Sequence, residues 1–168
     1  MRIRRVFFVP AAIPPHKGPS VLAPARHRHR MVRLAVGKSR GLAVSALEMR
    51  RPGPSYTIDT VRDFRRRFPG HALYFIVGAD TVRDIPNWHR WRDLIRKVRF
   101  IAVSRPGFRL APLKGYADRF VLLACRGYRT SSASLRVRLA RGRSTPELSP
   151  AVAAYIRRHG LYRPGATA

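Results

Sequence analysis

The clearest strand signal in the chain is the run Ala72-Leu-Tyr-Phe-Ile-Val77, which is followed by Gly78-Ala-Asp80. The run is apolar throughout, which is typical of a parallel strand that is covered on both faces. Gly78 allows a ligand to approach the backbone closely, and Asp80 offers a carboxylate to ribose hydroxyls or to an amino group. A turn-capping role for Asp80 is the alternative. Because ligands bind at the carboxyl ends of parallel strands, the end of this run is a candidate site.

Predicted strands and helices alternate on both sides of this run. Apolar runs closed by proline or glycine predict strands, and apolar residues at helical spacing predict helices. The other predicted strands are 5–10, 42–48, 100–103 and 120–124, and the predicted helices are 24–36, 58–68, 88–98, 132–141 and 149–159. Ser55 or Thr57 is expected to cap the second helix. The alternation indicates an α/β fold with a mostly parallel sheet, built as one domain over residues 1–168.

The net charge of +27 arises from 35 basic and 8 acidic residues. Such a charge favours nucleotides, nucleic acid or other polyanions as partners, and it carries no information about the fold. The basic residues run from Arg2 to Arg163 and do not gather in a tail. We therefore interpret most of them as solvated surface, and a basic nucleic-acid-binding module is the less favoured alternative.

Composition also restricts the class and compartment of the protein. A hydrophobic content of 45% is enough to build a buried core. The single cysteine, Cys125, can form neither an internal disulfide nor a CxxC site, so we expect a cytoplasmic protein. No apolar run approaches the ~20 residues that span a bilayer, and prolines interrupt the basic and apolar N-terminus that mimics a signal peptide.

Four loops are expected at the carboxyl ends of the strands, at residues 14–17, 54–57, 78–88 and 130–136. In the last of these, Ser131 and Ser132 precede a helix and offer N–H groups and hydroxyls to an anion, with Arg136 one turn further on. The alternative is that Ser132 only caps the helix and that Arg136 is one more surface arginine. Trp88 lies in a polar stretch, which permits a stacking role, although most tryptophans belong to the core.

Signals of other chemistry are absent from the sequence. The histidines, among them His16 and His89, lack neighbours at metal-ligand spacing, so no metal site is predicted. The sequence also contains no GxGxxG, no Walker loop and no Ser-His-Asp signature.

Several segments carry a more specific signal when they are taken together in their order along the chain. They are 6–17, 48–60, 73–91, 104–107, 131–136 and 155–162. The most specific pair is Pro54-Ser-Tyr-Thr57 with Gly78-Ala-Asp80 and Trp88. These segments resemble the bacterial nicotinate-nucleotide adenylyltransferases of the HIGH-type nucleotidyltransferase superfamily. The resemblance implies a Rossmann-like nucleotidyltransferase fold.

The resemblance also implies a reaction. Members of this family transfer AMP from ATP to nicotinate mononucleotide in NAD biosynthesis, and they form deamido-NAD and pyrophosphate with Mg²⁺ as cofactor. The implied chemistry is in-line attack of the mononucleotide phosphate on the α-phosphorus of ATP, without a covalent enzyme intermediate. Such a reaction depends on positioning and charge neutralisation more than on acid–base groups.

Individual residues take implied roles from the same resemblance. The residues implied to hold nicotinate mononucleotide are Thr57, Ile58, Trp88 and His89, with Trp88 stacked on the pyridine ring and the backbone near Thr57 on the carboxylate. The residues implied to contact ATP are His16, Gly78, Asp80, Ser131, Ser132 and Arg136. Catalytic roles near the phosphates are implied for Lys17 and Arg136.

Two departures from the family pattern bear on these expectations. The third hydroxyl of the family's Ile-Ser-Ser-Thr segment is replaced by Ala133, which removes one phosphate contact. No HxGH motif occurs in the chain, and Met1 precedes what resembles the family's second strand. We therefore expect the first strand and helix of the fold to be missing, and little AMP transfer by these residues alone. An inactive, nucleotide-binding relative is the second alternative.

Overall fold

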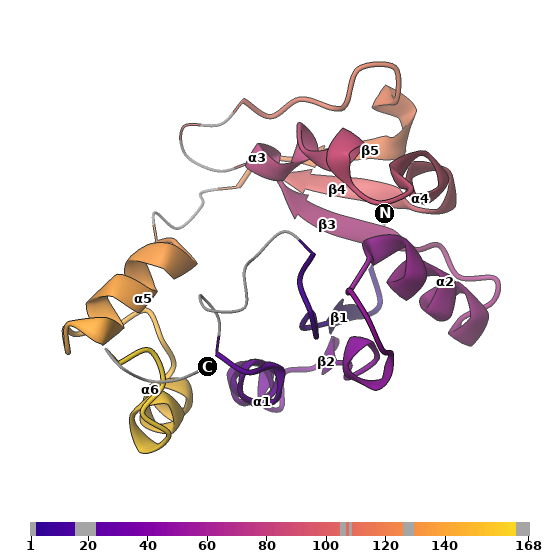
Figure 1. The fold of residues 1–168 in the computed structure, drawn as a ribbon. Coiled ribbons are helices and arrows are strands. Elements are labelled where there is room, and N and C mark those ends of the chain that lie inside the picture. The colour runs from indigo at the N-terminus through magenta and orange to yellow at the C-terminus, as the bar shows by residue number, and fades with distance from the viewer. Residues whose placement is uncertain (1–2, 16–22, 105–106, 108, 126–129, 164–168) are drawn as a thin grey trace. The chain divides into compact units, whose positions relative to one another are not determined.

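The computed structural model describes residues 3–15, 23–104, 107, 109–125 and 130–163. The chain divides into two compact units (Figure 1). Unit 1 consists of Met1–Ser55 with Thr130–Ala168, and unit 2 consists of Tyr56–Arg129. Among the helices of the described residues, none is both long and apolar enough to cross a membrane.

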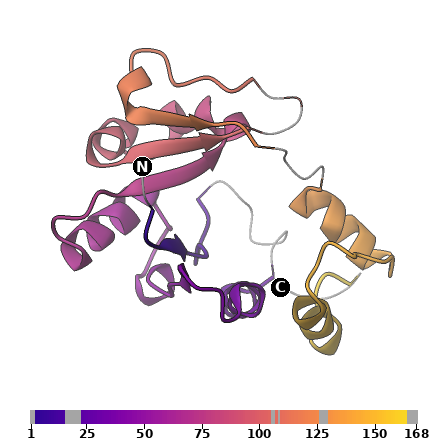
Figure 2. The same cartoon turned by 180° about the vertical axis from the view of Figure 1, so that it is seen from behind.

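Unit 2 is built on a three-stranded sheet with helices between its strands (Figure 2). Its elements are α2 (Thr57–Arg67), β3 (Tyr74–Gly78), α3 (Ala79–Val82), η3 (Ile85–Asn87), α4 (Trp91–Lys97), β4 (Arg99–Val103), η4 (Ala117–Arg119) and β5 (Phe120–Leu123). The strand order is β3-β4-β5, and both pairs are parallel. The register places Val77 opposite Ala102, so that apolar side chains of neighbouring strands lie side by side.

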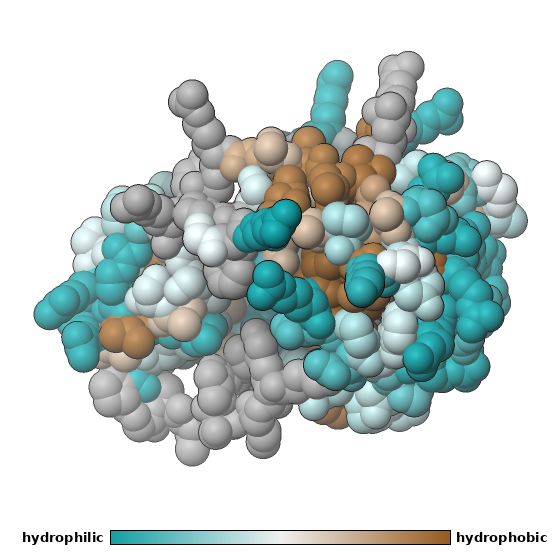
Figure 3. All heavy atoms as spheres, turned by 90° about the horizontal axis from the view of Figure 1, so that it is seen from above, coloured by the Kyte–Doolittle hydropathy of each residue, from teal (hydrophilic) through white to brown (hydrophobic). Residues whose placement is uncertain are grey.

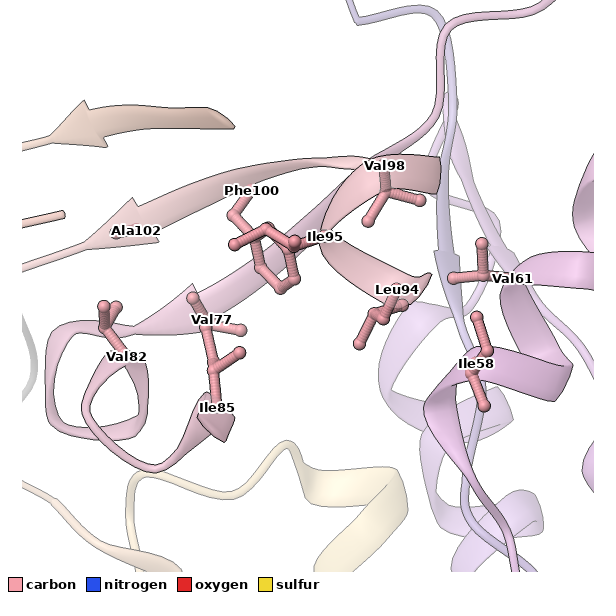
Figure 4. Packing of buried hydrophobic residues seen from close by; sticks show 10 residues of the cluster. All are labelled: Ile58, Val61, Val77, Val82, Ile85, Leu94, Ile95, Val98, Phe100 and Ala102. Atoms are coloured by element: carbon pink, nitrogen blue, oxygen red, sulfur yellow. The ribbon is translucent and has the colours of Figure 1, made fainter. Parts of the chain in front are cut away.

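The hydrophobic core of unit 2 lies between this sheet and its helices. Figure 4 shows the side chains of Val77 and Ile85 beside each other, near Ile95 and Phe100, and shows Leu94 in the same cluster. The side chains of Ile58, Ile85, Leu94 and Phe100 are fully buried. Burial of this apolar surface stabilises the unit and holds the ends of α2, β3 and α4 in place.

Unit 1 contains a smaller sheet. Its elements are β1 (Val6–Phe8), α1 (Ala25–Val36), β2 (Leu42–Val44), η2 (Glu48–Arg50), α5 (Ser132–Ala140) and α6 (Pro150–Arg158). β1 and β2 are parallel, and α1 contacts both β2 and α6. The strands, helices and parallel pairing predicted from the sequence are thus confirmed, although β2 ends at Val44 and α4 begins only at Trp91.

Two local predictions are wrong. The N-cap of α2 is Tyr56, whose side chain makes no capping hydrogen bond. The Ser55 hydroxyl instead accepts hydrogen bonds from the N–H groups of Ala12 and Ile13, which lie far away in sequence. The strand at 72–77 is not covered on both faces, because Ile76 is 48% exposed whereas Val77 is buried. Side chains alternate along a strand, so the helices of unit 2 cover only the face that carries Val77.

Apolar residues remain at the surface in several places. Figure 3 shows an apolar area with hydrophilic residues on several sides of it. The large hydrophobic residues that are exposed on β3 and β5 are Ile76, Leu122 and Leu123. Scattered exposed apolar residues are normal for a folded domain, and we assign them no function.

Candidate functional site

Two segments singled out by the sequence meet within unit 2. The ring of Tyr56, which is the N-cap of α2, stacks on the ring of His89, with centroids 4.1 Å apart and planes at 27°. This contact brings the start of α2 against the turn that carries Trp88 and His89. The structure therefore places the predicted mononucleotide-binding residues at one location, although 30 residues separate Ile58 from Trp88 in the sequence.

The N-terminus of α2 has the character of a carboxylate site. The first N–H groups of a helix have no acceptor within the helix, and here no side chain caps them. Thr57 and Ile58 contribute the first two of these N–H groups. Ile58 is fully buried, which anchors the helix end in the core. Backbone donors and the positive end of the helix dipole together favour a negatively charged group at this position.

Trp88 lies at the edge of the core of unit 2. It is partly buried, and it packs edge-to-face on Phe75 of β3, with ring centroids 5.8 Å apart. The backbone N–H of Trp88 donates to the carbonyl of Ile85 at 3.0 Å, which continues the turn from η3. The core and stacking interpretations of Trp88 are therefore compatible, because the indole packs against Phe75 while the residue stays partly exposed.

The turn after His89 is held by an ion pair. Arg90 adopts a left-handed backbone conformation with φ of 52°, which is unusual for a residue other than glycine. Its Nε and Nη2 donate to Oδ2 of Asp93 at 3.0 and 2.6 Å. These hydrogen bonds lower the pKa of the Asp93 carboxyl. The ion pair fixes the backbone that presents Trp88 and His89, and the sequence analysis missed it because charged pairs of this spacing are common in the chain.

Gly78 and Asp80 lie at the carboxyl end of β3, as the sequence predicts. Gly78 ends the strand and is the N-cap of α3, with an ordinary φ of −71°. Asp80 belongs to the first turn of α3. The carboxylate oxygen Oδ1 of Asp80 is buried.

In unit 1, the predicted anion site lies at the start of α5. The N-cap is Ser131 and not Ser132: Oγ of Ser131 accepts from the N–H of Ser134 at 3.1 Å, and Oγ of Ser134 accepts from the N–H of Ser131 at 3.3 Å. This reciprocal capping box fixes the helix start. Accepting a hydrogen bond does not use the hydroxyl's own proton, so Ser131 retains a donor for a phosphate oxygen.

Arg136 is half-buried, unlike a freely solvated surface arginine. Burial raises the pKa of the Tyr162 phenol, and the positive charges of Arg136 and Arg28 oppose that rise. Arg138, two residues further on, pairs with Glu147 at 2.5 Å. The two arginines of α5 are thereby distinguished, since Arg138 forms an ion pair with Glu147, whereas Arg136 forms none with a carboxylate of the described residues.

Some expectations lie beyond what the structure describes. His16 and Lys17 fall outside the described residues. Within the residues that are described, no group of three or more His, Cys, Asp or Glu side chains could hold a metal ion. Arg28 and Ser55 make long-range contacts that sequence reasoning missed, because nothing in the local pattern sets Arg28 apart from the other arginines.

Comparison with known proteins identifies the family. Residues 2–138 match the cytidylyltransferase-like family model. A probable nicotinate-nucleotide adenylyltransferase of Thermus thermophilus is 47% identical over 160 residues, which cover 95% of this chain and 83% of the relative. One from Symbiobacterium thermophilum is 41% identical over an alignment of 172 residues, which covers 97% of this chain and 83% of the relative.

A solved structure supports the fold. The nicotinic acid mononucleotide adenylyltransferase of Plasmodium falciparum, complexed with NaAD, matches with a TM-score of 0.75 and covers 95% of this chain and 82% of that one. At 19% identity this match shows the fold alone, which is the Rossmann-like nucleotidyltransferase fold. The family model and the bacterial relatives decide the assignment: the chain belongs to the cytidylyltransferase-like family, among the nicotinate-nucleotide adenylyltransferases.

Proposed function

We propose that this protein transfers AMP from ATP to nicotinate mononucleotide, the reaction after which its bacterial relatives are named. A phosphate oxygen of the mononucleotide attacks the α-phosphorus of ATP, the bond to the β-phosphate oxygen breaks, and pyrophosphate leaves. The observation that carries the proposal is the stack of Tyr56 on His89, which joins the start of α2 to the Trp88 turn.

The nicotinate half of the substrate fits the residues that this stack brings together. The N–H groups of Thr57 and Ile58 would hold the carboxylate at the helix N-terminus. The indole of Trp88 would stack on the pyridine ring, and the backbone of His89 would contact the same end of the substrate. The Arg90–Asp93 pair would maintain this turn while the substrate enters and leaves.

For the ATP half, we propose the residues that the resemblance implies, each within its own unit. Gly78 and Asp80 would contact adenosine at the end of β3. Ser131 and Ser132 would bind phosphate oxygens at the start of α5, and Arg136 would add a bidentate, charge-assisted contact. His16 would contribute to ATP binding, and Lys17, together with Arg136, would neutralise the charge that develops on the transferring phosphate.

Mg²⁺ enters this proposal as part of the substrate, bound to the phosphates of ATP. Mg²⁺ retains several waters and commonly binds through substrate phosphates instead of a dedicated cage of side chains. The chain's own residues then hold and orient the phosphates, and the ion supplies charge neutralisation.

We also propose that the two units form one nucleotidyltransferase domain in a cytoplasmic protein. The family match at 2–138 includes residues of both units, which supports a single domain. The free thiol of Cys125 and the nucleotide substrates support the compartment.

Calorimetric titration with deamido-NAD tests the proposal. Because a chain of charge +27 attracts many anions, each titration is repeated at high salt and with an unrelated dinucleotide of equal charge. We expect saturable binding of one deamido-NAD per chain. This binding should persist at salt concentrations at which the control dinucleotide no longer binds. Equal loss of both ligands with rising salt would overturn the proposal and would favour nonspecific polyanion binding.

The same protein is then incubated with ATP, Mg²⁺ and nicotinate mononucleotide. Deamido-NAD and pyrophosphate are expected in equal amounts, and only when both substrates are present. The rate measured in this assay tests the separate expectation, drawn from the missing HxGH motif, that these residues alone transfer AMP slowly.

A further inference from the structure

Arg28 of α1 binds backbone carbonyls at two separate places in unit 1. Its Nη1 donates to the carbonyl of Ala11 at 2.5 Å, and its Nη2 donates to that of Ala12 at 3.0 Å. Its Nε donates to the carbonyl of Ala23 at 2.9 Å. One planar guanidinium therefore connects residues 11–12, which follow β1, to the residue that lies two positions before α1.

Ser55 holds the same backbone from another direction. Its Oγ accepts from the N–H of Ala12 at 2.9 Å and from that of Ile13 at 3.2 Å. Its own N–H donates to the carbonyl of Ile13 at 2.8 Å. Ser55 is only 8% exposed, so these hydrogen bonds lie within the folded unit and are not exchanged freely for water.

Arg28 and Ser55 together serve five backbone groups of three consecutive residues, Ala11 to Ile13. These residues belong to no helix or strand, so their N–H and carbonyl groups need partners from elsewhere. Two side chains and the backbone N–H of Ser55 provide what a sheet would otherwise provide. The fork of a guanidinium suits this task, because its donors are rigid and point to neighbouring acceptors at the same time.

The charge of Arg28 is maintained by its surroundings. Burial lowers the pKa of this guanidinium, and the negative charge of Glu48 opposes that effect. Glu48 is 7% exposed, so a buried carboxylate accompanies the half-buried guanidinium. A charged donor makes stronger hydrogen bonds to carbonyls than a neutral one would.

We propose that Arg28 and Ser55 are positioning residues, which fix the backbone of 11–13 that leads directly to His16 and Lys17. The inference rests on the proposed function, because the backbone of 11–13 matters for the reaction only through the ATP contacts proposed for His16 and Lys17. Ser55 also directly precedes Tyr56, the N-cap of α2. One buried serine thus holds the backbone of residues 12–13 and directly precedes the helix that would bind the nicotinate carboxylate.

Limited proteolysis tests the structural half of the inference. An endoproteinase that cleaves only after lysine has four sites in the chain, at Lys17, Lys38, Lys97 and Lys114. Cleavage at Lys17 reports on the segment that follows residues 11–13. Cleavage at the other three lysines, measured in the same sample, reports on general destabilisation.

The variants Arg28→Ala and Ser55→Ala are expected to raise cleavage at Lys17, relative to the other three sites, about fivefold or more. Ser55→Thr keeps the hydroxyl and should restore the wild-type ratio. Arg28→Lys should be intermediate, because one ammonium group cannot reproduce the fork. Arg26→Ala and Arg30→Ala remove exposed arginines from the same helix and should change nothing. Equal acceleration at all four lysines, or no change at Lys17, would overturn the inference.

Affinity for deamido-NAD tests the functional half. We expect about tenfold weaker binding to Arg28→Ala and Ser55→Ala, and recovery in Ser55→Thr. Unchanged affinity in variants with faster cleavage at Lys17 would overturn the positioning role. If the wild-type protein did not bind deamido-NAD at all, the proposed function would fail, while the cleavage pattern would still decide whether the two residues hold the segment.

Discussion

The two units of this molecule are stabilised in different ways. Among the described residues, unit 2 contains most of the buried apolar side chains, which form one cluster around Phe100. In the part of unit 1 that the structure describes, the buried apolar residues are Ala23, Val36, Val152 and Ile156, and the buried polar ones are Glu48 and Ser55. Unit 1 relies instead on side-chain hydrogen bonds to its backbone.

This difference corresponds to the two tasks that we assign to the units. A nicotinate ring needs an apolar surface to pack on and a few backbone donors nearby. In unit 2, Trp88 would provide the apolar surface and the start of α2 would provide the donors. Phosphate groups need charged and polar donors at defined positions. Unit 1 provides these at the start of α5, and it holds its irregular segments with Arg28 and Ser55.

The largest expected effect is on the stability of unit 2. Phe100 is fully buried and contacts Phe75 and Phe120, so Phe100→Ala should lower the free energy of unfolding by about 3–5 kcal/mol. Val152→Ala in unit 1, which removes two buried carbons, should cost about 1–2 kcal/mol. Urea unfolding measures the loss of unfolding free energy in both variants, and equal losses would contradict the difference between the units.

The next effect concerns ATP. Arg136→Ala should weaken binding of an ATP analogue about tenfold or more, because a charge-assisted contact contributes roughly 1.5–3 kcal/mol. Arg141→Ala is the matched control, since Arg141 is exposed at the end of the same helix. Arg138 is unsuitable, because its removal would break the pair with Glu147. Equal losses in the two variants would show that the overall positive charge, and not a site, attracts the nucleotide.

Trp88→Ala should weaken nicotinate mononucleotide while leaving the ATP analogue nearly unaffected. Stacking on an aromatic side chain contributes about 1–3 kcal/mol, which corresponds to roughly fivefold to hundredfold in affinity. Parallel titrations with the two ligands measure the difference. A lower melting temperature with unchanged mononucleotide affinity would restrict Trp88 to its packing on Phe75.

The smallest effect is a pH dependence in unit 1. His27 contacts Tyr155 and His159, and burial, Arg26 and His159 lower the pKa of its imidazole from 6.5. The unfolded chain therefore takes up the proton first as the pH falls. The stability that neutral His27 contributes is present above about pH 6.5 and is lost as the pH falls through the lower folded pKa.

Thermal unfolding across that pH range tests this assignment. His27→Gln should show a smaller fall in melting temperature on acidification than the wild type, whereas His71→Gln at an exposed position should behave like the wild type. An equal fall in melting temperature with falling pH for the wild type and His27→Gln would contradict this assignment.

The sequence predicts those features of the fold that depend on local patterns. The apolar run at 72–77 and the helical spacing of Ile58 and Val61 are strong signals, because their burial follows directly from periodicity. The cap of α2 could not be predicted, since Ser55 binds backbone more than 40 residues away in sequence. Exposure of Ile76 also escaped prediction, because an apolar run does not reveal how many faces of a strand are covered.

Prediction of the candidate site succeeded and failed in the same way as prediction of the fold. Motif resemblance selected Thr57, Trp88 and His89, and the structure brings their segments together. The residues that hold these segments, such as Arg90, were missed because a left-handed arginine paired with an aspartate leaves no signal that distinguishes it from other surface charges.

Nuclear magnetic resonance of the isotope-labelled protein tests the central claim most directly, because it locates each ligand on named residues. Nicotinate mononucleotide is predicted to shift the backbone amides of Thr57, Ile58 and His89 and the indole of Trp88, which a Trp88→Phe variant assigns. An ATP analogue is predicted to shift Ser131, Ser132 and Arg136. Shifts of the α5 residues by nicotinate mononucleotide, with none at the start of α2 or at Trp88, would contradict the account.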